Sequence, residues 1–206
     1  MIKPKHNNFW IRFSQIYTRL LFKFYFHKLN FIDQFTDTGK PIFMISNHFS
    51  FWDGFIQVVL LEKLINRKYH FMMLESELRK NMILRTIGAF SINKNNRDSI
   101  ESLNFCAEVL KDKNNLLLIF PQGVIESIYK EDFEFESGLG YILKKVKNDI
   151  QFIFNVNLLH YGSNKKPEID VYFENYEMKT KNVEEIQDAF NKYYKKCLNK
   201  QRQRND

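Results

Sequence analysis

Residues 41–46 read PIFMIS, and residues 115–120 read NLLLIF. Both stretches are short, continuous apolar runs. A strand that is covered on both faces reads in this way, whereas a strand with one face in water alternates apolar and polar residues. Because segments with helical spacing lie between such runs over most of the chain, the sequence predicts an α/β fold. We expect a single domain with a largely parallel mixed sheet flanked by helices.

The other elements continue this alternation. No stretch rich in Pro, Gly or Ser divides the chain, and no internal repeat is found at the usual solenoid periods. We therefore place the α/β domain at residues 36–206, after an N-terminal helical segment at residues 1–35. Further extended segments are predicted at residues 69–74, 89–92, 151–159 and 168–173, and helices at residues 53–66, 76–86, 98–112, 137–148 and 182–198.

The N-terminal segment contains a predicted amphipathic helix, residues 9–29. A wide aromatic arc beside a basic ridge suits a helix that lies in a membrane interface, with rings in the acyl boundary and cations at anionic headgroups. The alternative is an ordinary amphipathic helix that covers the core of the domain itself. The apolar side carries Trp10, Phe13, Tyr17, Leu20, Leu21 and Phe24, and the basic side carries Arg12, Arg19 and Lys23.

Composition narrows the class of protein. The 206 residues include 21 Phe and 10 Tyr but only 7 Gly and 4 Pro, which argues against a disordered chain. The formal net charge of +7 implies an anionic partner, either nucleic acid or an acidic membrane surface. A nucleic-acid-binding module has no recognisable motif here. Cys106 and Cys197 are far apart and give no disulfide framework, which fits a reducing compartment.

Several other chemistries lack their sequence patterns. There is no HxxxH or HExxH spacing, so we predict no metal site, and no GxGxxG or GxxxxGK(S/T) loop to cradle a nucleotide. No uncharged apolar run approaches the length of about 18 residues that a transmembrane helix needs, and the basic N-terminus lacks the features of a secretory signal. Four histidines are interpreted as structural or surface residues: His6, His27, His70 and His160.

The fifth histidine, His48, lies in the stretch SNHFSFWDG, residues 46–54, between a predicted strand and a predicted helix. In an α/β sheet, sites are built at the carboxyl ends of strands. Asp53, five residues later, can fold back to the imidazole, keep one ring nitrogen protonated and leave the other as a base. The plainer alternatives are a structural histidine and an aspartate that caps the helix.

Asn47-His48-x-Ser50-x-x-Asp53 resembles the NHxSxxD block of the glycerolipid and lysophospholipid acyltransferase family, which includes the 1-acylglycerol-3-phosphate acyltransferases. Three further stretches agree in order: Gly88 to Lys94 resembles the GxxxIxR block, Phe120-Pro121-Gln122-Gly123 resembles FPEG, and Ser137-Gly138-Leu139 resembles the helix start that follows. The resemblance covers roughly residues 40–160. It implies His48 and Asp53 as the catalytic pair and, for substrate binding, Asn47, Ser50, Gly88, Lys94, Arg97, Phe120, Pro121, Gln122 and Gly123.

The resemblance also implies a reaction. A histidine base takes the proton of an acceptor hydroxyl as this hydroxyl attacks an acyl thioester, and no acyl-enzyme is required. The co-substrate would be acyl-CoA or acyl-carrier protein, with no further cofactor. The expected partners are lipids of an anionic membrane surface, and the expected location is peripheral, on the cytoplasmic side of a membrane.

Two blocks depart from the family pattern. Lys94 replaces the arginine that engages the acceptor phosphate, and lysine supplies charge without the planar fork of arginine. Gln122 replaces the glutamate of FPEG, and Glu126 brings a negative charge to a stretch that usually carries an arginine. These changes point to an acceptor other than simple lysophosphatidic acid, such as a glycolipid or another hydroxylated lipid. The alternative is a member of the fold that binds lipid without catalysis.

Overall fold

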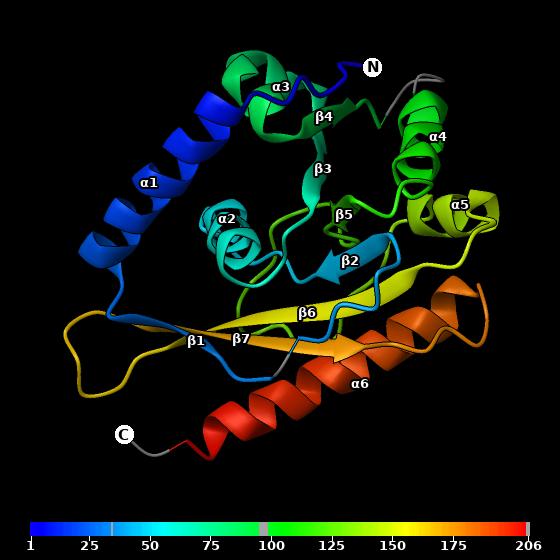
Figure 1. The fold of residues 1–206 in the computed structure, drawn as a ribbon. Helices are drawn as coiled ribbons and strands as arrows, with labels where there is room; N and C mark the ends of the chain where they lie inside the picture. Colours follow the sequence, from blue (N-terminus) through cyan, green and yellow to red (C-terminus); the bar gives the residue numbers. More distant parts are fainter. Residues whose placement is uncertain (34, 95–98, 205–206) are drawn as a thin grey trace.

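The computed structural model describes residues 1–33, 35–94 and 99–204, and within them the chain folds around one seven-stranded sheet (Figure 1). The strand order is β1-β7-β6-β2-β5-β3-β4, and neighbouring strands are parallel except β6 and β7. The predicted α/β fold with a largely parallel mixed sheet is confirmed. The strands are β1 Lys28–Phe31, β2 Ile42–Ser46, β3 Lys68–Leu74, β4 Ala89–Ile92, β5 Asn115–Ile119, β6 Gln151–His160 and β7 Glu168–Asn175.

Helices cover both faces of the sheet (Figure 1). Alternate residues of each central strand face opposite layers, so the two apolar runs quoted above supply both layers of the core. On one face Phe43 and Leu117 pack with α4, α5 and α6, and on the other Ile42 and Leu116 pack with α1 and α2. The helices are α1 Asn8–Tyr25, α2 Asp53–Lys63, α3 Glu75–Lys80, the 3-10 helix η1 Met82–Ile87, α4 Ser99–Val109, α5 Gly138–Lys145 and α6 Val183–Arg202.

Two elements differ from the prediction. The helix predicted over residues 9–29 ends at Tyr25, because Phe26 is extended and the chain continues as β1, which pairs with β7. This strand lies inside the predicted N-terminal segment, yet it belongs to the sheet. The helix predicted over residues 76–86 is divided into α3 and η1, because Asn81 leaves the helical conformation with φ −131° and ψ 54°.

Helix α1 lies along one side of the domain, next to α2 (Figure 1). Thr18 and Phe22 are the residues of α1 that are buried, and Phe22 packs edge-on against Trp52. The other face keeps large apolar side chains in solvent: Phe9, Phe13, Ile16, Tyr17, Leu20, Phe24 and Tyr25. No helix in the described part of the chain is long and apolar enough to cross a bilayer.

Candidate active site

The shared direction of four neighbouring strands brings the sequence blocks together. β2 is parallel to β5, β5 to β3, and β3 to β4, so their carboxyl ends lie at one edge of the sheet. His48 follows β2, Phe120 follows β5, and Lys94 follows β4. Stretches separated by many residues in the sequence therefore form one site, at the edge where α/β proteins place their active sites.

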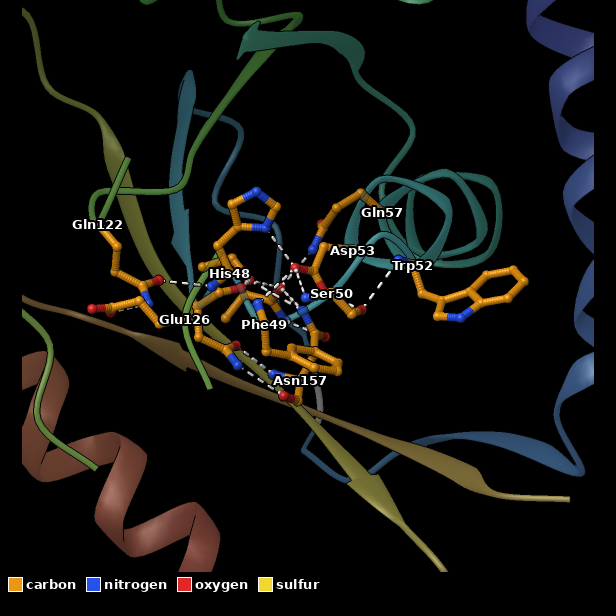
Figure 2. A network of polar contacts seen from close by, with 12 residues as sticks. His48, Phe49, Ser50, Trp52, Asp53, Gln57, Gln122, Glu126 and Asn157 are labelled. Atoms are coloured by element: carbon orange, nitrogen blue, oxygen red, sulfur yellow. Dashed lines mark hydrogen bonds and ion pairs between the residues drawn. The ribbon is translucent and has the colours of Figure 1, made fainter. Parts of the chain in front are cut away.

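His48 and Asp53 are in direct contact. His48 Nδ1 lies 2.6 Å from Asp53 Oδ2, and the Asp53 side chain is completely buried (Figure 2). The imidazole stacks on the Phe120 ring, with the centroids 4.3 Å apart and the planes 19° apart. This packing fixes the ring plane, and the contact with Asp53 occupies Nδ1. Nε2 is therefore the ring nitrogen that is available to accept or donate a proton.

The loop between β2 and α2 is built around the Asp53 carboxylate. Oδ2 also accepts from the backbone N–H groups of Phe49 at 2.8 Å and Ser50 at 3.0 Å, and Oδ1 accepts from the Ser50 hydroxyl at 3.2 Å (Figure 2). Trp52 holds the N-cap position of α2, so Asp53 is the first helical residue and its carboxylate points back into the loop. These donors satisfy a buried charge that would otherwise be costly.

Asn47 fastens the same loop to β6. Its side-chain Nδ2 donates to the Asn157 carbonyl at 2.9 Å, and its Oδ1 accepts from the Asn157 N–H at 2.8 Å. Two residues earlier on β6, Asn155 Oδ1 accepts from Ser46 Oγ at 2.9 Å and from Gln57 Nε2 at 2.8 Å. Gln57, Asn155 and Asn157 were not predicted as site residues from the sequence. The visible signal was two asparagines inside the apolar run of residues 151–159.

Gln122 supports the histidine through the backbone. Its Oε1 accepts from the His48 N–H at 2.7 Å, and its Nε2 donates to Glu126 Oε2 at 2.7 Å (Figure 2). Glu126 in turn forms an ion pair with Lys130, and its own N–H donates to the His48 carbonyl at 2.9 Å. Partial burial opposes ionisation of Glu126, but hydrogen bonds from Lys130 and Gln122 lower the net pKa of its carboxyl group.

A large apolar pocket opens beside His48. Its volume is about 880 Å³, large enough for an acyl chain, and its walls come from α1, α2, β3, η1, α5 and the loop after β5. Of the predicted site residues, His48, Lys94, Phe120, Pro121 and Gly123 line it.

Four other predicted substrate-binding residues do not line this pocket. Asn47, Ser50 and Gln122 support the loop that carries His48, as described above. Gly88 begins the turn into β4 with φ +114°, and a Cβ there would lie 2.0 Å from the Tyr69 carbonyl oxygen. Arg97, the remaining predicted residue, lies outside the described residues.

Residues 23–153 match the family model Acyltransferase, which is more than half of the chain. The chain therefore belongs to the Acyltransferase family, and the family predicted from the sequence blocks is confirmed. The fold is similar to the crystal structure of the 1-acyl-sn-glycerophosphate (LPA) acyltransferase PlsC from Thermotoga maritima, with a TM-score of 0.62 and 14% sequence identity. The similarity covers 94% of this chain and 81% of that one. The search of curated proteins gave no match.

Proposed function

We propose that the protein transfers a fatty acyl group from an acyl-CoA or acyl-carrier-protein thioester to a hydroxyl group of a lipid acceptor, with His48 as the general base. The observation that supports this most strongly is the contact of His48 Nδ1 with buried Asp53, at the wall of an apolar pocket of about 880 Å³. Family membership supplies the reaction class. The pocket is apolar and large enough to hold an acyl chain, and His48 lies in its wall.

The proton transfers follow from this arrangement. Nε2 of His48 takes the proton of the acceptor O–H while the oxygen attacks the thioester carbonyl carbon. Asp53 stabilises the imidazolium that forms. Collapse of the tetrahedral intermediate breaks the C–S bond, and the imidazolium returns the proton to the leaving thiolate. The products are an ester and a free thiol, and the histidine ends neutral.

The thiols of the protein do not suit a covalent route. Cys106 and Cys197 are fully buried in the described structure, within the core between the sheet and the helices α4 and α6. Burial raises the pKa of the Cys106 thiol, and it raises that of Cys197 to about 12. A buried thiol that stays protonated is a poor nucleophile. Direct attack by the acceptor hydroxyl is therefore the mechanism that we propose.

The exposed apolar face of α1 supports a location on a membrane surface. Phe13, Leu20 and Phe24 are at least half exposed, and Trp10, Phe13 and Tyr17 also line the pocket. A bilayer that covers this face would therefore lie beside the pocket wall. We propose that the protein is peripheral, on the cytoplasmic side of the membrane, where anionic lipids attract its net charge of +7.

The test is incubation of the purified protein with labelled acyl-CoA or labelled acyl-carrier protein and a total lipid extract, followed by product identification by mass. The His48→Ala variant is expected to lose the product signal, while His27→Ala, which changes a half-exposed histidine outside the pocket wall, keeps it. Equal transfer by His48→Ala and the unaltered protein would overturn the base assignment. Lipid binding without transfer to any acceptor would favour a non-catalytic lipid-binding protein.

A further inference from the structure

The cation in the pocket wall is already paired. Lys94 Nζ lies 2.7 Å from Glu136 Oε1 and donates to the Gly123 carbonyl at 3.1 Å. Both Lys94 and Glu136 line the pocket together with His48. The sequence blocks predicted Lys94 as a substrate-binding residue, but Glu136 is far away in the sequence and no block pointed to it.

The turn after β5 holds this pair in place. The Glu136 N–H donates to the Pro121 carbonyl at 2.9 Å, so the backbone of residue 136 is fixed to the turn. Gly123 has φ +69°, and a Cβ at this position would lie 2.5 Å from Lys94 Nζ and 3.0 Å from Glu136 Oε1. The ion pair therefore packs directly on a glycine, and three separate segments meet at it. The pair is part of the architecture of the wall.

The surrounding charges do not favour an anion. The lining side chains that carry a formal charge in the described part of the chain are Lys94, Glu77 and Glu136. Glu77 is paired with Lys80 and Lys94 with Glu136, so this wall offers an incoming anion no unpaired cation among the described residues. Lys130, the nearby cation of the 120–130 stretch, is paired with Glu126. A phosphate monoester carries a charge of about −1.5 to −2 at neutral pH and would have to displace Glu136 from Lys94 while remaining beside its carboxylate.

A lysine–glutamate pair suits hydroxyl groups better. The ammonium donates hydrogen bonds and the carboxylate accepts them, so together they can bind both the oxygen and the hydrogen of neighbouring hydroxyls without taking up net charge. Resting on the proposed function, we infer that the acceptor has an uncharged, hydroxyl-rich headgroup, such as a glycerol or sugar, and that Glu136 is the residue that selects against a phosphate monoester.

The experiment compares two acceptors that share one acyl chain, 1-oleoylglycerol and 1-oleoylglycerol 3-phosphate, with the same labelled thioester. For the unaltered protein we expect kcat/KM to be higher for the uncharged acceptor, on the order of tenfold. Glu136→Gln keeps the shape of the side chain and removes its charge, which frees Lys94. This variant should raise kcat/KM for the phosphate acceptor by on the order of tenfold and leave the uncharged acceptor without a comparable gain.

The matched control is Glu108→Gln. Glu108 lies on α4, outside the pocket wall, and is paired with Lys111. It should leave the preference between the two acceptors unchanged. Equal or faster transfer to the phosphate acceptor by the unaltered protein would overturn this inference but leave the acyltransferase proposal standing. An unchanged preference in Glu136→Gln would overturn the role of Glu136. If a folded protein transfers to neither acceptor nor to total lipid, the proposed function itself fails.

Discussion

His48 Nδ1 and Asp53 Oδ2 lie 2.6 Å apart, and the same Asp53 oxygen also accepts the backbone N–H groups of Phe49 and Ser50. One buried carboxylate therefore shapes the loop and orients the imidazole. Removing the side chain would abolish both the support of the loop and the orientation of the imidazole. A variant that removes only the negative charge affects the two roles to different degrees. Asparagine at position 53 has the same size as aspartate, but its side chain has one oxygen acceptor and one NH₂ donor. Some of the groups that donate to the Asp53 carboxylate would then face a donor instead of an acceptor.

The first prediction concerns Asp53→Asn. We expect acyl transfer to fall by at least about 10²-fold, because the imidazolium loses its counter-charge and the ring its fixed tautomer. We also expect a lower free energy of unfolding, because buried N–H donors lose part of their acceptor. Single-turnover transfer and urea unfolding measure the two effects.

Ser50→Ala serves as the comparison for Asp53→Asn. It removes the hydroxyl that donates to Asp53 Oδ1 at 3.2 Å but leaves Oδ2 and His48 Nδ1 in contact. Both effects should therefore be smaller than in Asp53→Asn. A full transfer rate in Asp53→Asn would show that the carboxylate has no part in catalysis.

The second prediction concerns the Gln122–Glu126 pair. In the unaltered protein the Gln122 amide donates to the Glu126 carboxylate at 2.7 Å. In Gln122→Glu one oxygen can still accept from the His48 N–H, but the other would lie against the Glu126 carboxylate with no proton to donate. We expect a loss of about 1–3 kcal/mol in the free energy of unfolding. Glu126→Gln alone should have a smaller effect, since two amides can still form the bond.

The double variant Gln122→Glu with Glu126→Gln reverses the donor and the acceptor. We expect it to recover most of the stability lost in Gln122→Glu, because the amide now donates from position 126. Urea unfolding of the four proteins gives the coupling energy directly. A coupling energy of zero would mean that the two side chains act independently. The glutamine at position 122 and the glutamate at position 126 are therefore two coupled departures from the family pattern, joined by one hydrogen bond.

The predictable part of the fold depended on local patterns. The runs PIFMIS and NLLLIF could be identified as central strands because they are apolar on both faces, and β2 and β5 lie side by side in the middle of the sheet. β1 was missed because its alternation is short: Leu29 and Phe31 pack against the core, and Lys28 is exposed. The helical pattern before it continued into this segment, and only pairing with β7 decides that it is a strand.

Within the site, the contacts that could be predicted were those between residues close together in the sequence. The His48–Asp53 contact depends on spacing within one loop, so the sequence could indicate it. The partners of Lys94 and Asn47 could not be predicted, since Glu136 and Asn157 arrive from distant segments through the order of the strands. Polar residues in an apolar strand, such as Asn155, indicate a buried network but not its members.

The third prediction orders three glycine-to-alanine variants by stability. Gly88→Ala should cost about 2–4 kcal/mol, because φ is +114° and the new Cβ would meet the Tyr69 carbonyl at 2.0 Å. Gly123→Ala should cost about 1–2 kcal/mol, because φ is +69° and the atoms that the new Cβ would meet belong to the long side chains of Lys94 and Glu136 rather than to the backbone. Gly54→Ala, with no atom within 4 Å, should be neutral or stabilising by up to about 1 kcal/mol. Thermal unfolding checks this order, and a Gly54→Ala variant as unstable as Gly88→Ala would contradict it.

The fourth prediction concerns acid stability and His70. Burial lowers the pKa of this imidazole from 6.5 to about 4, and the neighbouring His6 adds to the shift. Between these two values the unfolded chain binds a proton at residue 70 and the folded protein does not. The free energy of unfolding should therefore fall as the pH drops from 6.5 towards 4, by up to about 1.4 kcal/mol per pH unit from this group.

His70→Phe keeps a ring at this position and cannot titrate. Its free energy of unfolding should depend less steeply on pH in the same window, although His6, whose pKa burial also lowers, still contributes. Urea unfolding at several pH values compares the two slopes. Identical slopes would show that His70 is not the group responsible.

The fifth prediction tests the exposed face of α1. Phe13, Leu20 and Phe24 are 50%, 62% and 70% exposed, and replacing all three by serine leaves the buried residues of α1, Thr18 and Phe22, unchanged. If α1 lies in a membrane interface, the triple variant should bind vesicles that contain phosphatidylglycerol at least about 10²-fold more weakly, because each lost side chain contributes about 1.5–3 kcal/mol when buried. Its thermal unfolding should stay close to that of the unaltered protein. The control is Ile100→Ser. Ile100 is 49% exposed and lies on α4, a helix that packs on the opposite side of the sheet through other residues. Unchanged vesicle binding together with a marked fall in thermal stability would instead identify α1 as a cover for the core of the domain.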